Sequence, residues 1–206
     1  MIYTEDFYKA ANELIKAGQF IDKKGWVPAT SGNFSARLPD GTIAITVSGK
    51  HKGLLQTEDI MLIDAEARSL DGKQPSAETL LHTLIYQRYP DIHAVLHPHS
   101  LNSVLISRLF TGACRLENYE LLKAFNGINS HETCISVPIF ANDQDIPRLA
   151  AHVETYLDQQ PMCYAYLIAG HGLYTWSKSV NQTLRYLEAL DFLFSCELHL
   201  YGANHS

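Results

Sequence analysis

The sequence predicts an α/β fold, a single-domain layered structure whose central, largely antiparallel sheet is flanked by helices. Apolar residues recur with helical spacing near both ends of the chain, at 4–24 and 180–200. Between them lie short runs rich in β-branched residues, separated by turn signals such as Pro39-Asp40-Gly41. Short neighbouring strands joined by tight turns pair antiparallel. No linker or internal repeat divides the 206 residues, so we expect one domain over 1–206.

Composition excludes several classes of function. The formal charge of -6 argues against a nucleic-acid or acidic-membrane partner, because such surfaces need a positive electrostatic footprint. The N-terminus lacks the basic and apolar regions of a signal peptide, and no apolar run reaches transmembrane length. The four cysteines show no Cys-x-x-Cys spacing, which favours free thiols in a reducing compartment. A cytoplasmic protein is therefore expected.

The first half of the chain predicts one helix, three strands and a second helix. Thr4 can cap a helix that runs to about Lys24, where Gly25 is a natural stop. Ser76 is expected to cap the second helix and to place Glu78 in its first turn, with Pro90 just past its end. The strands between them are predicted at about 33–38, 42–47 and 61–63.

The second half continues the alternation of strands and helices. A strand runs from Ala94 into two histidines, and Ser100 then caps a helix that bears Leu101, Leu105 and Leu109. Residues 117–125 are interpreted as a short strand or turn followed by a helical turn. The remaining elements are predicted as a strand at 133–140, a helix at 146–157, strands at 164–169 and 173–176, and a closing helix at 180–200.

Three histidines at strand ends point to a metal site. His97 and His99 are two residues apart, and in an extended strand such side chains project from the same face. His171 lies between two glycines at the end of another apolar run, where the backbone can bend closely around an ion. Three imidazoles with one open position are a typical catalytic zinc site. Ordinary hydrogen-bonded histidines are the alternative interpretation.

Two loops and two carboxylates are weaker candidates. Ser31-Gly32-Asn33 and Ser48-Gly49-Lys50 expose small side chains and backbone N–H groups, and Lys52 follows the second loop; such concave turns bind anions, although ordinary hairpin turns look the same. A helix N-terminus near Ser76 would add partial positive charge. Glu78 could simply stabilise the helix dipole, and composition gives Glu120 no role beyond a solvated helix position.

Several ordered motifs resemble the class II sugar-phosphate aldolase and epimerase superfamily, and the match covers nearly the whole chain. Within it, four blocks resemble the 5-methylthioribulose-1-phosphate dehydratases of methionine salvage. The superfamily motifs are Ser31-Gly32-Asn33-Phe34-Ser35, Ser48-Gly49-Lys50, Pro75-Ser76-Ala77-Glu78-Thr79, His97-Pro98-His99-Ser100 and Gly170-His171-Gly172. The dehydratase blocks are residues 27–33, 48–53, 119–125 and 171–176. One departure is Pro98, where the family usually has threonine.

The resemblance implies the residues of an active site. It implies one zinc ion per subunit, held by His97, His99 and His171. It matches Glu120 to the catalytic acid/base of the dehydratases, and Glu78 to a carboxylate that serves as base or extra ligand in the aldolases. It implies a homotetramer with active sites near subunit interfaces. The phosphate pocket that it implies comprises Asn33, Ser48 and Gly49, assisted by Ser76 and Lys50.

The expected reaction is the removal of water between C3 and C4 of a 2-ketose phosphate. Removing the C3 proton forms an enediolate that a Lewis-acidic metal stabilises, and a carboxylate protonates the departing C4 hydroxyl. An aldolase or epimerase that uses the same enediolate is the first alternative. The block Tyr119-Glu120-Leu121-Leu122-Lys123 favours the dehydratases over it. A non-catalytic, adducin-like interaction domain is less favoured because all three histidines are retained.

Overall fold

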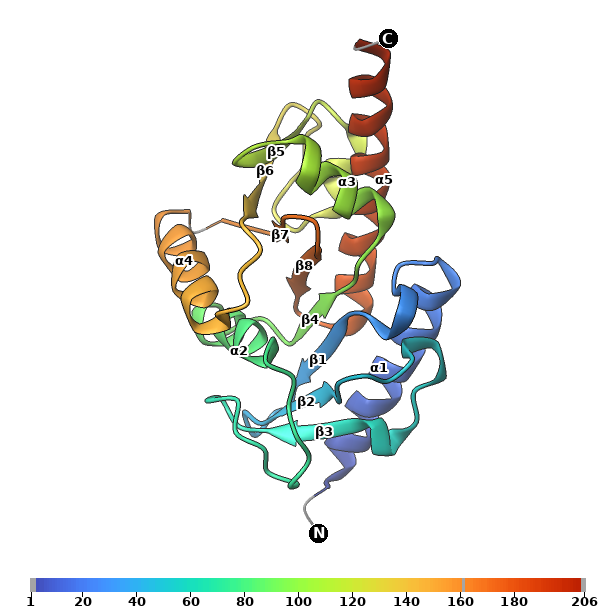
Figure 1. The fold of residues 1–206 in the computed structure, drawn as a ribbon, viewed down its shortest axis with the longest axis vertical. Coiled ribbons are helices and arrows are strands. Elements are labelled where there is room, and N and C mark those ends of the chain that lie inside the picture. The colour runs from blue at the N-terminus through green and yellow to red at the C-terminus, as the bar shows by residue number, and fades with distance from the viewer. Residues whose placement is uncertain (1–2, 161, 205–206) are drawn as a thin grey trace.

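The computed structural model of the chain describes residues 3–160 and 162–204, and its eight strands form one mixed sheet (Figure 1). The strand order is β3-β2-β1-β4-β8-β7-β6-β5. Of the strand pairs in the described part of the chain, only β6–β7 is parallel, which confirms the predicted fold class. The strands are β1 Asn33–Arg37, β2 Ile43–Thr46, β3 Ile60–Ile63, β4 Ala94–His97, β5 Ala113–Glu117, β6 Cys134–Phe140, β7 Ala165–Ile168 and β8 Gly172–Ser177.

Helices cover both faces of this sheet. The apolar sides of α1, α3 and α5 share one buried cluster with one face, and α2 and α4 share a second cluster with the other. The last part of α5 projects beyond the sheet (Figure 1). The helices are α1 Glu5–Lys23, α2 Thr79–Arg88, α3 Leu101–Leu109, α4 Ile146–Gln159 and α5 Val180–Asn204.

The alternation of side chains along β4 places the first histidine. Ala94 and Leu96 belong to the cluster under α1 and α5, whereas Val95 belongs to the cluster under α2. Because successive strand residues face opposite sides, His97 shares the face of Val95. Its ring stacks on Tyr174 of β8, with 3.9 Å between ring centroids. The first candidate ligand therefore lies between the sheet and α2.

Most predicted helix ends are confirmed, and one is wrong. Thr4 Oγ1 accepts a hydrogen bond from the Phe7 N–H at 3.3 Å, and Ser100 Oγ accepts one from the Ser103 N–H at 3.2 Å, as caps do. The helix predicted to start at Ser76 begins only at Thr79. Residue Glu78 is its N-cap rather than part of its first turn, because residues 76–78 form a turn before the helix.

One strand lies outside the predicted elements. Residues 117–125 are predicted as a short strand or turn followed by a helical turn, and the 3₁₀ helix Glu120–Ala124 confirms the helical turn. The strand β5, Ala113–Glu117, begins before this segment and was not predicted. The buried Cys114 and Leu116 alternate with exposed neighbours along β5, so the signal was present but short. The four cysteines are free thiols. None of the described helices is both long and apolar enough to cross a membrane.

Candidate metal centre

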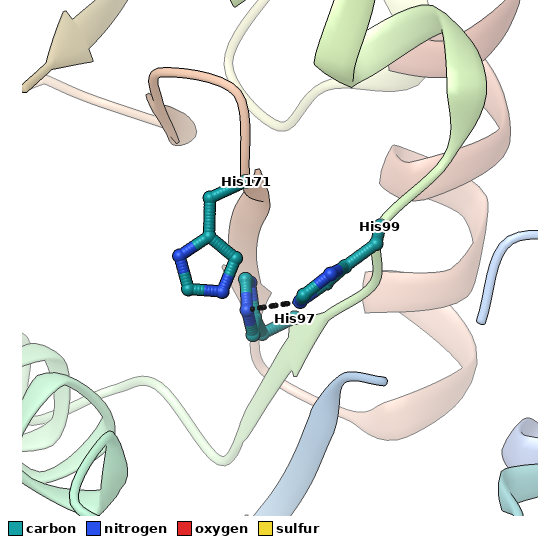
Figure 2. A group of neighbouring side chains, drawn as sticks. All are labelled: His97, His99 and His171. Carbon is teal, nitrogen blue, oxygen red and sulfur yellow. Dashed lines mark hydrogen bonds between the residues drawn. The ribbon is translucent and has the colours of Figure 1, made fainter. Parts of the chain in front are cut away.

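The fold brings the three predicted histidines to one point (Figure 2). His97 ends β4, His99 follows it by two residues, and His171 lies in the turn between β7 and β8. One ring nitrogen from each lies within 4.8 Å of the other two, and the Nε2 atoms of His97 and His99 are 2.9 Å apart. Ligands at about 2.0–2.1 Å in a tetrahedral zinc site would lie about 3.4 Å from one another, so the three imidazoles fit a single ion.

His99 does not lie in the same strand as His97, although the sequence argument assumed that both belong to one strand. Strand β4 ends at His97, so His99 belongs to the loop before α3. Its backbone N–H donates to the carbonyl of Trp26 at 2.8 Å, and the Pro98 carbonyl accepts from the Leu173 N–H at 3.1 Å. The proline between the histidines therefore needs no donor of its own, because its neighbours hold the loop.

Contacts behind the histidines fix their orientation. The Nδ1 of His97 lies 3.0 Å from the Leu173 carbonyl, so it must carry the proton and leaves Nε2 free as a ligand.

The turn that carries His171 also needs its second glycine, Gly172. A Cβ on Gly172 would lie 2.5 Å from the Pro98 carbonyl oxygen and 2.9 Å from Cδ2 of His99. A larger residue at this position would push the two ligand-bearing segments apart.

The carboxylate of Glu78 also contacts the histidine cluster. Its Oε1 lies 3.0 Å from Nε2 of His171 and 3.8 Å from Nε2 of His97, and its Oε2 accepts a hydrogen bond from the Asn33 amide. Burial raises the pKa of Glu78, but the hydrogen bond with His171 and the interactions with the neighbouring imidazoles outweigh burial and lower that pKa to about 2. The carboxylate is ionised at neutral pH.

His97 and His99 lie in an environment that favours their neutral form. Burial is the main cause of the pKa of His97 lying well below its ordinary value, and burial also lowers the pKa of His99 to about 4. A neutral imidazole offers the lone pair that a metal ligand needs. Three imidazoles beside one ionised carboxylate are a donor set suited to a divalent cation such as zinc.

The candidate phosphate residues are only partly brought together. Ser48, Lys50 and Ser76 line one hollow beside the N-terminus of α2. Lys50 is paired with Asp59 at 3.0 Å, with 54% of its side chain exposed. Gly49 has the left-handed φ of 74° that lets its loop turn. Asn33 instead contacts Glu78, so it lies between this loop and the histidines.

The structure does not bring Glu120 to the histidines of its own chain. The carboxylate is 72% exposed and contacts Lys123 at 2.6 Å and His131 at 3.9 Å. The Lys123 hydrogen bond is the main cause of its lowered pKa. It lines a different hollow, which is formed with Phe192 and other residues of α5. A catalytic role for Glu120 therefore stays a prediction that needs a second chain.

Sequence reasoning missed two features of the site. It named Asn33 and Glu78 separately, and their mutual hydrogen bond depends on β1 lying beside the start of α2. It also gave no role to Tyr174, whose ring packs against His97. The only sequence signal for Tyr174 is its position in an alternating strand, which any core residue shares.

The sequence matches one family and a group of curated proteins over almost all its length. The family described as class II aldolase and adducin N-terminal domain matches residues 12–198. A methylthioribulose-1-phosphate dehydratase from Methylococcus capsulatus is 64% identical over 201 residues, which cover 98% of each chain. One of the same name from Pseudomonas syringae pv. syringae is 53% identical, covering 91% of this chain and 93% of its own.

Solved structures share the fold at lower identity. YgbL from Klebsiella pneumoniae superimposes with a TM-score of 0.81 at 22% identity, covering 96% of this chain and 92% of its own. A structure named L-fuculose 1-phosphate aldolase superimposes with a TM-score of 0.79 at 20% identity, covering 99% and 89%. At these identities the likeness establishes the arrangement of sheet and helices alone.

Proposed function

The chain belongs to the class II aldolase and adducin family, and from this premise we propose that it is a methylthioribulose-1-phosphate dehydratase. The observation that carries the proposal is the 64% identity, over nearly both full lengths, to a protein of that name. The cluster of three histidines beside an ionised carboxylate is its chemical support. The product would be 2,3-diketo-5-methylthiopentyl 1-phosphate, which places the reaction in methionine salvage.

We propose zinc, one ion per subunit, as the metal. The residues that would hold it are His97, His99 and His171, whose ring nitrogens converge; the lowered pKa values of His97 and His99 favour their neutral form. When bound, the ion supplies Lewis-acid stabilisation of negative charge on the substrate's carbonyl oxygen, worth several kcal/mol.

Within this chain, Glu78 is the group placed to take a proton. The substrate must lose the C3 proton next to its carbonyl, and the acceptor must be ionised before the substrate binds. Glu78 is ionised, and the Asn33 amide fixes the direction of its carboxylate. Its contact with His171 also suits an additional metal ligand, so both roles belong to the proposal.

A phosphate subsite lies beside this centre. We assign to it Asn33, Ser48, Gly49, Lys50 and Ser76. The shared hollow of Ser48, Lys50 and Ser76 supports the assignment, as does the left-handed turn at Gly49, because turns of this kind direct backbone N–H groups toward an anion. Asn33 joins the two parts of the site, because it follows one candidate anion loop and contacts Glu78.

The exposure of Glu120 supports an active site shared between subunits. A general acid that protonates the leaving C4 hydroxyl must lie within hydrogen-bond reach of it. Glu120 is on the surface of its own chain, so we propose that it serves the metal centre of a neighbouring copy in a homotetramer. Large apolar side chains exposed in the same hollow suit such a contact, among them Phe192 at 59% and Leu121 at 38% exposure.

Mass spectrometry of the products separates this proposal from its alternative, an aldolase or epimerase with the same centre. Purified protein is incubated with 5-methylthioribulose 1-phosphate, with and without a chelator. The dehydratase predicts loss of one water molecule from the substrate, abolished by chelation and restored by zinc. Two fragments would indicate an aldolase. An unchanged substrate with a fully zinc-loaded protein would contradict the dehydratase and leave other sugar phosphates, or a binding role, to be tested.

A further inference from the structure

Lys52 is a buried lysine whose ammonium group has no acidic partner. Only 1% of the residue is exposed, and no carboxylate in the described part of the chain lies within ion-pair distance of its Nζ. The ammonium instead donates to the carbonyl oxygens of Thr30, at 2.9 Å, and Lys50, at 2.8 Å. Burying a charge is costly unless it makes strong hydrogen bonds, so a lysine with two neutral acceptors requires a physical explanation.

Those two carbonyls lie at the edges of the two loops that contain the proposed phosphate-binding residues. Thr30 precedes Ser31-Gly32-Asn33, and Lys50 follows Ser48-Gly49. Both loops contain left-handed backbone: φ is 51° at Ala29, 65° at Thr30 and 74° at Gly49. For residues other than glycine this conformation costs about 1–2 kcal/mol each, so contacts must hold it in place. The Lys52 ammonium makes such a contact with each loop.

The first of these loops also touches the metal centre. The Trp26 carbonyl accepts from the His99 N–H at 2.8 Å. A Cβ on Gly32 would lie 2.6 Å from the His97 carbonyl oxygen, so the loop passes directly over that ligand's backbone. At the end of the loop, Asn33 donates to Glu78. A displacement of Thr30 would therefore disturb the backbone contacts of His97 and His99 and the hydrogen bond to Glu78.

The positive charge of Lys52 is more available to attract a bound anion than that of its neighbour Lys50. The Lys50 ammonium is exposed and already paired with Asp59. Burial lowers the pKa of Lys52 to about 8, with the negative charge of Glu78 opposing part of that shift, so Lys52 is mostly protonated at neutral pH. A fixed buried charge is screened less by salt and solvent than a surface charge.

We propose that Lys52 is the positioning residue of the phosphate subsite. By binding one carbonyl oxygen from each loop, it holds both loops in register, with their N–H and hydroxyl groups turned toward the anion, and it places one positive charge behind them. This inference rests on the phosphate subsite proposed above, but it does not depend on which sugar phosphate is the substrate.

The test compares Lys52→Met with Lys178→Met in the zinc-loaded protein. Both variants remove one lysine charge, and Lys178 is an exposed residue paired with Asp91, outside the proposed site. Affinity for inorganic phosphate is measured by thermal shift, KM and kcat with 5-methylthioribulose 1-phosphate, and zinc by elemental analysis. Lys52→Met should keep its zinc, bind phosphate roughly tenfold more weakly and raise KM more than it lowers kcat. Lys178→Met should match the wild type.

A Lys52→Met variant that melts earlier but binds phosphate normally would overturn the proposal, because the lysine would then only stabilise the fold. If that variant does not fold, hydrogen exchange of the wild-type protein decides. Saturating phosphate should slow exchange in 28–32 and 48–53 together, and protection of one segment alone, or of neither, would overturn the proposal. Wild-type activity tests the dehydratase assignment separately, since phosphate affinity is measured without turnover.

Discussion

Glu78 Oε1 lies 3.0 Å from Nε2 of His171, although the two residues come from the start of α2 and from the turn between β7 and β8. The same carboxylate is held on its other oxygen by Asn33. One ionised group thus touches a candidate metal ligand and a residue of the proposed phosphate subsite.

Replacing either end of the histidine cluster should remove the metal. His97→Ala and His171→Ala are each expected to lower bound zinc to a small fraction of one ion per chain, because two remaining imidazoles bind far more weakly than three. Circular dichroism should show a folded protein in both, with His97→Ala the less stable because His97 is fully buried. Full zinc occupancy in both variants would place the metal elsewhere.

The substitution Glu78→Gln keeps the shape of the side chain and removes its charge. If Glu78 takes the C3 proton, kcat should fall roughly 10²–10⁴-fold while zinc stays bound. If it acts mainly as a metal ligand, zinc content should fall together with activity. The exposed Glu66 offers a matched control, and Glu66→Gln should have no effect. Near-normal turnover in Glu78→Gln would remove this residue from the mechanism.

Glu120→Gln should lower kcat by a similar factor, and mixing variants tests where the residue acts. A chain with Glu120→Gln keeps its metal site, and a chain with His97→Ala keeps Glu120. If Glu120 serves a neighbouring subunit, co-expression of the two inactive variants should restore part of the activity through mixed contacts. No recovery in a purified mixed oligomer would argue that both residues act within one chain.

The Asn33→Ala variant should affect both binding and turnover. Loss of a phosphate-subsite group raises KM, because phosphate contacts are largely the same in the ground and transition states. Loss of the amide donor also frees the Glu78 carboxylate, so kcat should fall as well, by roughly tenfold. Ser48→Ala is the comparison, since it should raise KM alone. An unchanged KM in both variants would move the phosphate subsite.

A buried histidine outside the metal cluster should make stability depend on pH. Burial lowers the pKa of His82 to about 4, with the charge of Glu78 acting in the opposite direction. The unfolded chain, with a pKa near 6.5, binds the proton more readily, so stability is complete above about pH 6.5 and falls as the pH drops toward 4. From pH 7 to 5 the loss due to His82 should be roughly 2 kcal/mol.

Urea unfolding of the metal-free protein at the two pH values measures this loss. The metal is removed beforehand because its release at low pH would also lower the stability of the protein. The His82→Gln variant keeps a polar group beside Ser35 and should show a correspondingly smaller difference between pH 7 and pH 5. Equal differences in the variant and the wild type would show that His82 does not titrate on unfolding.

The sequence by itself determined most of the elements and the kinds of residue at the site. Thr4 and Ser100 capped their predicted helices because capping depends on atoms within three residues. The apolar runs that end near His97 and His171, and the spacing of His97 and His99, indicated three imidazoles at one site. Each of these signals acts over a few residues, and local signals can be read from a single chain.

Only the tertiary structure decided how these residues meet. It joined Asn33 to Glu78, buried Lys52 between two loops and left Glu120 on a separate surface. It also left Leu101 on the outside of α3, although that residue belongs to a regular apolar pattern. These outcomes depend on which segments pack against one another, and packing between distant segments is set by the whole sheet rather than by the residues of any one segment.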